Sequence, residues 1–258
     1  MPRRCRPRSR SWAEPARTAT TSSASTKIDR AGPVGRDNVI GRVKLWDLPV
    51  RICHWGFVLL IPAMWWTAEN HEMGWHTRLG LLLLAQVVFR ILWGFVGSST
   101  ARFRGFLRGP GAVLRYFGSL RGSHVPIVGH NPAGGWSVIA LLGAMVLQLG
   151  MGLFAGDPYD GATGPLNDLV GVMTADTLTE WHENFFWVLV ALIALHVLAI
   201  VLYLAIRRDN LVGPMITGSR AMAGDARGMA AVPAWRALAC LLLAFAFAGW
   251  IWAGAPPF

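Results

Sequence analysis

Five apolar segments, each close to the length that a helix needs to cross a lipid bilayer, constrain the fold of this chain more than any other feature. They cover approximately residues 49–67, 75–96, 134–154, 181–206 and 234–254. About 20 apolar residues in a helix span the hydrocarbon layer. Since backbone polar groups in lipid must be satisfied within the protein, we expect each segment to be a helix. The sequence therefore predicts an all-α membrane protein, which also accounts for its 53% hydrophobic and 15% charged residues.

The residues before the first apolar segment have a different composition. Residues 1–43 are basic and rich in Ser, Thr and Pro, and they contain no apolar run of the kind that a cleavable signal peptide needs. We predict that they form a disordered basic tail. Asp47 and Pro49 follow, and they are residue types that cap and open a helix.

The charged residues predict the orientation in the membrane. Residues 1–53 contain 12 Lys and Arg, and the connection 97–133 contains five Arg and no acid. The connections 68–74 and 155–180 contain no Lys or Arg but seven Asp and Glu. Basic loops favour the cytoplasmic side, so we expect a cytoplasmic N-terminus and a fifth helix that ends outside. The net charge of +10 is then explained by the basic residues of the cytoplasmic connections, and no nucleic-acid partner is expected.

Four of the seven histidines lie in or at the ends of apolar segments: His54, His76, His182 and His196. Ionisable residues inside a membrane are expensive and usually functional. His182 and His196 are 14 residues apart, which places them on one face of a helix and about 21 Å apart along its axis. They therefore belong to two separate sites.

Each of these sites needs a second histidine from another helix at a matching depth. His76 and His182 each lie one residue after a tryptophan at the outer end of their segments, and His54 and His196 lie towards the inner side. The inner match is looser, and the fourth helix must overhang or tilt to make it. Hydrogen bonds between helices are the alternative role for any single histidine.

Two histidine pairs between the helices of a four-helix bundle are typical of sites for haem b with two axial imidazoles. Arg78 and Arg90 lie within the second segment, and an arginine fork suits the propionates of haem. We expect Arg78 at the outer site and Arg90 at the inner site, with snorkelling towards lipid headgroups as the alternative.

Several motifs resemble the prokaryotic cytochrome b561 family, which includes the b-type cytochrome subunits of nickel–iron hydrogenases. The resemblance runs from about residue 43 to residue 218 and rests on LWDLPVRICHW, HTRLGLLLLAQVVFRILWGFVGSSTARFRGFLRGPGAVLRY, GHNPAGGW, EWHENFF, ALHVLAI and DNLVGPMITG. It implies a dihaem cytochrome that moves electrons between the quinone pool and a partner redox protein. It also places His54, His76, His182 and His196 at the axial-ligand positions.

Other residues near these motifs have alternative roles. His71 lies five residues before His76 and is an alternative outer ligand, although loops position ligands poorly. Asn131 and His130 are expected to cap or order the loop before the third helix, with quinone contact as the alternative for His130.

The expected organisation is a basic tail (1–43), a dihaem cytochrome b561-like transmembrane domain (44–218), and a linker with an extra transmembrane helix (219–258). We expect a multi-pass protein of the bacterial inner membrane that holds two haem b. The sequence leaves open whether it also binds a quinone. It would carry electrons between the quinone pool and cytochrome c or a catalytic subunit. The alternatives are a haem-bearing anchor of a hydrogenase- or reductase-type complex and a histidine-based metal or proton transporter. No residue pair indicates a stand-alone catalytic site, and the sequence does not indicate an oligomeric state.

Overall fold

The computed structural model describes residues 40–119, 129–157, 162–223 and 228–255. All described residues belong to one compact unit. Residues 1–39 of the expected tail therefore lie outside the described residues. Five described helices are long and apolar enough to cross a membrane, which confirms the predicted number.

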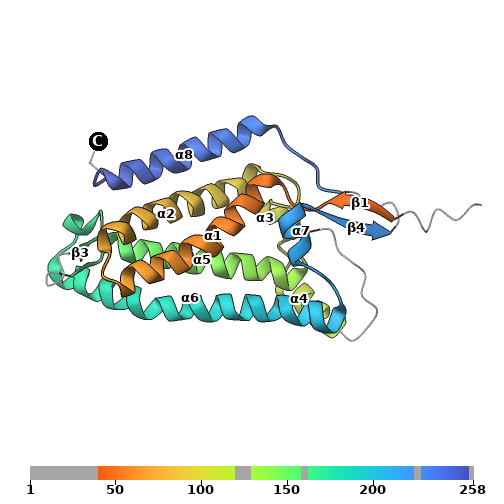
Figure 1. Cartoon of the computed structure of the whole chain (residues 1–258), viewed down its shortest axis with the longest axis horizontal. Helices are drawn as coiled ribbons and strands as arrows, with labels where there is room; N and C mark the ends of the chain where they lie inside the picture. Colours follow the sequence, from red (N-terminus) through yellow and green to blue (C-terminus); the bar gives the residue numbers. More distant parts are fainter. Residues whose placement is uncertain (1–39, 120–128, 158–161, 224–227, 256–258) are drawn as a thin grey trace, which may run out of the picture. The chain divides into compact units, whose positions relative to one another are not determined.

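The structure is almost entirely helical (Figure 1). The five long helices are α1 (Leu48–Glu69), α2 (Met73–Val96), α5 (Pro132–Phe154), α6 (Val172–Arg207) and α8 (Ala234–Trp252). The short helices are α3 (Phe103–Phe106), α4 (Pro110–Ser119), α7 (Val212–Thr217) and the 3-10 helix η2 (Asn167–Leu169). Two small antiparallel sheets pair β1 (Ile40–Lys44) with β4 (Ser219–Ala223), and β2 (Gly156–Asp157) with β3 (Ala162–Thr163).

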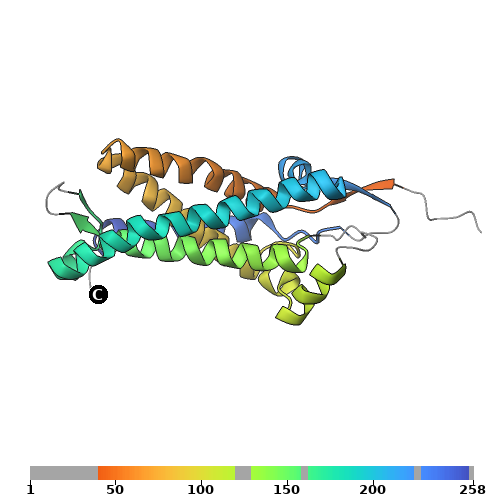
Figure 2. The same ribbon diagram turned by 90° about the horizontal axis from the view of Figure 1, so that it is seen from below.

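The long helices run between two ends that carry different connections. One end holds the turn between α1 and α2 together with β2 and β3, and we call it the turn end (Figure 1). The other holds β1, β4, α3, α4 and α7, and we call it the β1–β4 end (Figure 2). In the turn, His71 adopts a left-handed backbone conformation with φ 58°. Within the bundle, α2 packs against α1, α5 and α8, and α5 packs along α6.

The helix α6 is longer than the sequence predicted. It begins at Val172, nine residues before the expected start at Trp181. Thr179 bonds to Gly156, just beyond α5, so the residues of α6 before Thr179 project past α5 at the turn end. These residues are helical but include Thr174, Asp176 and Thr177, so the apolar segment did not extend over them.

At the β1–β4 end α6 also overhangs its neighbour. Asn131, which caps α5, donates a hydrogen bond to the hydroxyl of Tyr203 at 3.2 Å, so the last four residues of α6 extend past the start of α5. His196 is seven residues before Tyr203, and His54 is seven residues after Asp47, which caps α1. At 1.5 Å per residue both histidines lie about 10 Å from this end. Because α6 extends past the start of α5, His196 lies at about the same depth as His54 although it is farther from the end of its helix.

The small β1–β4 sheet joins segments that the sequence placed in separate regions. Ile40 pairs with Ala223 and Lys44 with Ser219. The last residues of the expected tail are therefore in a strand, and the expected linker begins with its partner. Because these partners are more than 170 residues apart in the chain, local patterns in the sequence did not indicate the pairing.

Asp47 connects the start of α1 to α2 and the core beside it. Its carboxylate accepts a hydrogen bond from the Val50 amide at 2.8 Å and another from Trp93 Nε1 at 2.9 Å. Trp93 is 2% exposed and packs with residues of α1, α2 and α8, including Cys53 and Cys240. The expected cap at Asp47 is confirmed, and it also satisfies a buried indole N–H.

We predict that Asp47→Ala destabilises the protein by about 1–3 kcal/mol, because it removes a helix cap and leaves the Trp93 N–H without an acceptor. Thermal unfolding in detergent, followed by circular dichroism, measures the effect. Asp47→Asn keeps one side-chain oxygen for the cap and should lie between wild type and Asp47→Ala. Equal stability of all three proteins would contradict the double role of Asp47.

Candidate functional site

His76 of α2 and His182 of α6 lie side by side near the turn end. Their ring centroids are 6.2 Å apart and the ring planes are at 84°. His76 lies four residues after the N-cap of α2, and His182 lies three residues after Thr179, which marks the end of α5. The depth match expected from the sequence is therefore present in the structure.

Both imidazoles are held in the same tautomer by backbone carbonyls. His76 Nδ1 donates to the Met64 carbonyl of α1 at 3.0 Å, and His182 Nδ1 donates to the Gln148 carbonyl of α5 at 2.9 Å. Since a carbonyl oxygen only accepts, each Nδ1 carries the proton and each Nε2 keeps its lone pair. This is the usual arrangement of a metal-binding histidine, in which the second nitrogen bonds to an outer partner.

The separation of the two rings also fits two ligands of one metal ion. A metal–imidazole bond is about 2 Å long and the ring centre lies about 1.1 Å beyond the nitrogen, so rings on opposite sides of one ion have centres about 6 Å apart. The observed 6.2 Å agrees with this value. The His76–His182 pair therefore suits an iron ion with two axial imidazoles, as in haem b.

A glycine on α5 makes room for the ring of His182. A Cβ atom at Gly152 would lie 2.7 Å from His182 Cε1, so only glycine fits without displacing the imidazole. A Cβ atom at Gly143 or Gly150 of the same helix, by contrast, meets nothing within 4 Å. Gly152 was missed because only the approach of α6 distinguishes it from the other glycines of α5.

His54 of α1 and His196 of α6 form the second pair, towards the β1–β4 end. They are near enough to interact electrostatically, and His196 Nδ1 lies 3.5 Å from the Ser137 hydroxyl of α5. His54 Nδ1 is buried and has no hydrogen-bond partner among the described residues. This pair therefore places two imidazoles that could bind a metal ion at one depth. It lacks the hydrogen bonds to backbone carbonyls that hold His76 and His182.

The two arginines of α2 have different surroundings. Arg78 is exposed, and its guanidinium lies 5.4 Å from the ring centroid of Trp75. Arg90 is 6% exposed and lies over the Phe103 ring, and its Nη1 has no partner among the residues that the structure describes. Asp47 interacts with Arg90 electrostatically, but its two carboxylate oxygens already accept bonds from Val50 and Trp93. A buried cation without a bonded anion is costly, so Arg90 suits a bound carboxylate.

The remaining candidates lie in loops. His71 is exposed in the α1–α2 turn, away from the packed rings of His76 and His182. Asn131 caps α5 by accepting a bond from the Gly134 amide at 2.7 Å, as expected. His130 packs between Trp46 and Phe106, with centroid distances of 4.6 and 4.5 Å, and orders the loop before α5.

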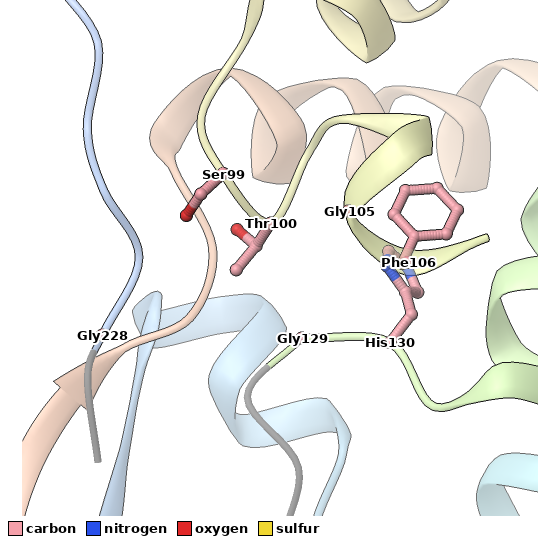
Figure 3. Close-up of a pocket in the computed structure, with 7 residues that line it drawn as sticks. All are labelled: Ser99, Thr100, Gly105, Phe106, Gly129, His130 and Gly228. Carbon is pink, nitrogen blue, oxygen red and sulfur yellow. The ribbon is translucent and has the colours of Figure 1, made fainter. Parts of the chain in front are cut away.

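A cavity of about 170 Å³ lies next to His130. Figure 3 shows His130 and Phe106 on one side of it and Ser99 and Thr100 on the other. The hydroxyl groups of Ser99 and Thr100 are already bonded to Ala230 and Leu45. Typical ligand pockets are larger, roughly 300–1,000 Å³, and the cavity therefore adds little support to quinone contact at His130.

The pKa of His130 gives a prediction for the pH dependence of stability. Burial, together with the positive charge of Arg90, lowers this pKa from 6.5 to about 3. As the pH falls from 6.5 towards 3, the unfolded chain takes up a proton that the folded protein excludes, so the free energy of unfolding decreases.

We expect His130→Phe to lose less stability than wild type when the pH is lowered from about 7 to about 5. Thermal midpoints measured at both pH values test this. An identical decrease in the two proteins would mean that His130 does not contribute to acid sensitivity.

Comparison with known proteins identifies a matching family and several relatives. The sequence model of the prokaryotic cytochrome b561 family matches residues 45–218. A probable Ni/Fe-hydrogenase B-type cytochrome subunit of Bradyrhizobium diazoefficiens is 26% identical over 241 residues, which cover 80% of this chain and 96% of that protein. Proteins of the same description from Azotobacter chroococcum mcd 1 and Azotobacter vinelandii are each 25% identical over 223 residues, 71% of this chain and 90% of theirs. No solved structure matches the chain.

The family match covers more than half of the chain, and the bundle of membrane-length helices fits it. The chain therefore belongs to the prokaryotic cytochrome b561 family and is a membrane electron-transfer protein that binds haem b.

Proposed function

We propose that this protein is the dihaem cytochrome subunit of a membrane-bound hydrogenase-type complex and carries electrons between a catalytic subunit and the quinone pool. The observation that supports this most directly is the His76–His182 pair, whose ring separation and Nδ1 bonds suit two axial ligands of one iron ion. Bound haem supplies the one-electron iron couple that this function requires.

The two histidine pairs are proposed to hold two haem b, one near each end of the bundle. His76 and His182 would be the axial ligands at the turn end, and His54 and His196 those at the β1–β4 end. The helices α1 and α6 bury few of their own residues, so both offer apolar surface to a macrocycle. Cofactor sites of helix bundles are built in the core from side chains on facing helices, as proposed here.

Arg90 and Arg78 are proposed partners of the haem propionates. Arg90 supports this role most strongly, since its buried Nη1 has no partner among the described residues. Arg78 lies on the turn of α2 next to His76 and is held over Trp75. Both would form charge-assisted bonds to carboxylates, and such bonds fix the orientation of the bound group.

The β1–β4 end is proposed to be cytoplasmic in a bacterial inner membrane. Most charged residues described at this end are basic, and most of those described at the turn end are acidic. Basic examples are Arg102, Arg104, Arg108, Arg115 and Arg207, and acidic examples are Glu69, Glu72, Asp168, Asp176 and Glu180. Since α8 runs back towards the turn end, the C-terminus would then be outside.

The names of the relatives favour a hydrogenase as the catalytic partner over cytochrome c. Its docking side would be the acidic turn end, nearest to the His76–His182 pair. A metal transporter is less well supported, because structural zinc sites use four ligands. In the described part of the chain, no group of three or more His, Cys, Asp or Glu is placed to hold a metal ion.

The haem content and the effect of histidine substitutions test the proposed function. Purified protein should contain two b-type haems per chain, measured by a reduced-minus-oxidised spectrum and haem quantification. His76→Ala or His182→Ala should remove one haem and keep the other, and His54→Ala or His196→Ala should remove the second. A protein without haem, or one in which substituting His76 and His182 together removes none, would overturn the proposal.

Gly152→Ala tests the close fit of His182 on α5. The added Cβ atom would lie 2.7 Å from the imidazole, so we expect loss or altered ligation of the haem at the His76–His182 pair alone. Gly143→Ala is the matched control, because Gly143 is nine residues away on the opposite face of α5 and has open space around it. Low-temperature absorption spectra distinguish the two outcomes, and equal spectra for both variants would contradict the close fit.

A further inference from the structure

Two glutamines inside the membrane-spanning bundle make the same type of contact beside different histidines. Gln86 belongs to α2 and faces α1, and Gln148 belongs to α5 and faces α6. An amide in lipid has no water to bond with, so leaving its donors unsatisfied is costly. Both side chains satisfy a donor across a helix–helix contact, next to a proposed haem ligand.

At the His76–His182 pair the contact is reciprocal. Gln148 Nε2 donates to the backbone carbonyl of His182 at 2.8 Å, and His182 Nδ1 donates to the backbone carbonyl of Gln148 at 2.9 Å. Gln148 is 9% exposed. The side chain of each residue is thus bonded to the backbone of the other, which fixes both the height and the rotation of α6 at the imidazole.

Beside His54 the contact has the same construction. Gln86 Nε2 donates to the backbone carbonyl of Cys53 at 2.8 Å, and the Cys53 thiol donates to the backbone carbonyl of Gln86 at 3.7 Å. The amide of Gln86 occupies the space over Gly56, where a Cβ atom would overlap it. Since Cys53 and Gly56 flank His54 in the chain, this contact fixes α1 at the histidine.

We infer that Gln148 and Gln86 are positioning residues, one for each histidine pair: Gln148 sets the placement of His182, and Gln86 sets the placement of His54. This inference rests on the proposed dihaem function. Neither glutamine is a ligand, and the His182 Nδ1 bond uses a backbone carbonyl that every residue at position 148 would supply. Substitution should therefore leave the haem bound and change only the geometry of its ligation.

The two glutamines provide controls for one another. In Gln148→Met the haem of the His76–His182 pair should shift its low-spin electron paramagnetic resonance signal and its midpoint potential, while the other haem is unchanged. In Gln86→Met the reverse is expected. The single-histidine variants described above assign each signal to its pair. Leu147→Met on α5 and Leu82→Met on α2, both at exposed positions, control for introducing methionine.

If the glutamines only stabilised the fold, substituting one of them would not change the signal of one haem selectively. If both signals are unchanged in both variants, or if each variant alters both haems alike, the inference is wrong. If wild-type protein contains no haem, the proposed function fails. If wild type contains two haems but the glutamine variants have no selective effect, only the positioning roles fail.

A second pair of variants covers the case in which the methionine proteins do not fold. Gln148→Glu and Gln86→Glu keep the side-chain length, and a neutral carboxyl group can still donate a hydrogen bond. We expect each variant to keep both haems and to shift only the signal of the haem at the substituted contact. An unchanged signal at that haem, or an equal shift of the other haem, would overturn the inference.

Discussion

The apolar interior of the membrane requires every polar group between the helices to find a partner within the protein. His76, His182, Gln86 and Gln148 meet this requirement with backbone carbonyls of neighbouring helices. A helical carbonyl has a second lone pair, so these bonds do not disrupt the helix that accepts them. The contacts that pair the helices therefore also place the imidazoles of His76 and His182.

The long helices contribute different residues to the two sites. The helix α6 carries one histidine of each pair, and α1 and α2 supply the partners. The helix α5 supplies none, yet it contacts both histidines of α6 through Gln148 and Ser137. It therefore supports α6 by packing along it, and Gly152 allows the imidazole of His182 to approach α5 closely. On the other side of the bundle, α8 packs on α2 around Cys240 and Ala244.

Sequence patterns predicted the features that depend on local chemistry. Apolar length gave the five helices, helical periodicity paired His182 with His196 on one face, and the cap at Asp47 followed from its residue type. The extension of α6 before Trp181 was missed because helical residues outside lipid do not have to be apolar. The pairing of β1 with β4, and the role of Gly152, depend on contacts between distant segments and have no local signal.

The buried charge of Arg90 is not fully compensated by the described part of the polypeptide. Arg90 is 6% exposed, and the nearby Asp47 is already bonded to Val50 and Trp93. Stacking on Phe103 offsets part of the cost of burying the charge, because aromatic faces attract cations, but it does not neutralise the charge. A carboxylate on a bound group would neutralise the charge of Arg90. It would lie at the same depth as the His54–His196 pair. In the proposed site, the cation and the two imidazoles thus require the same ligand, an apolar iron-bearing macrocycle with acidic side groups.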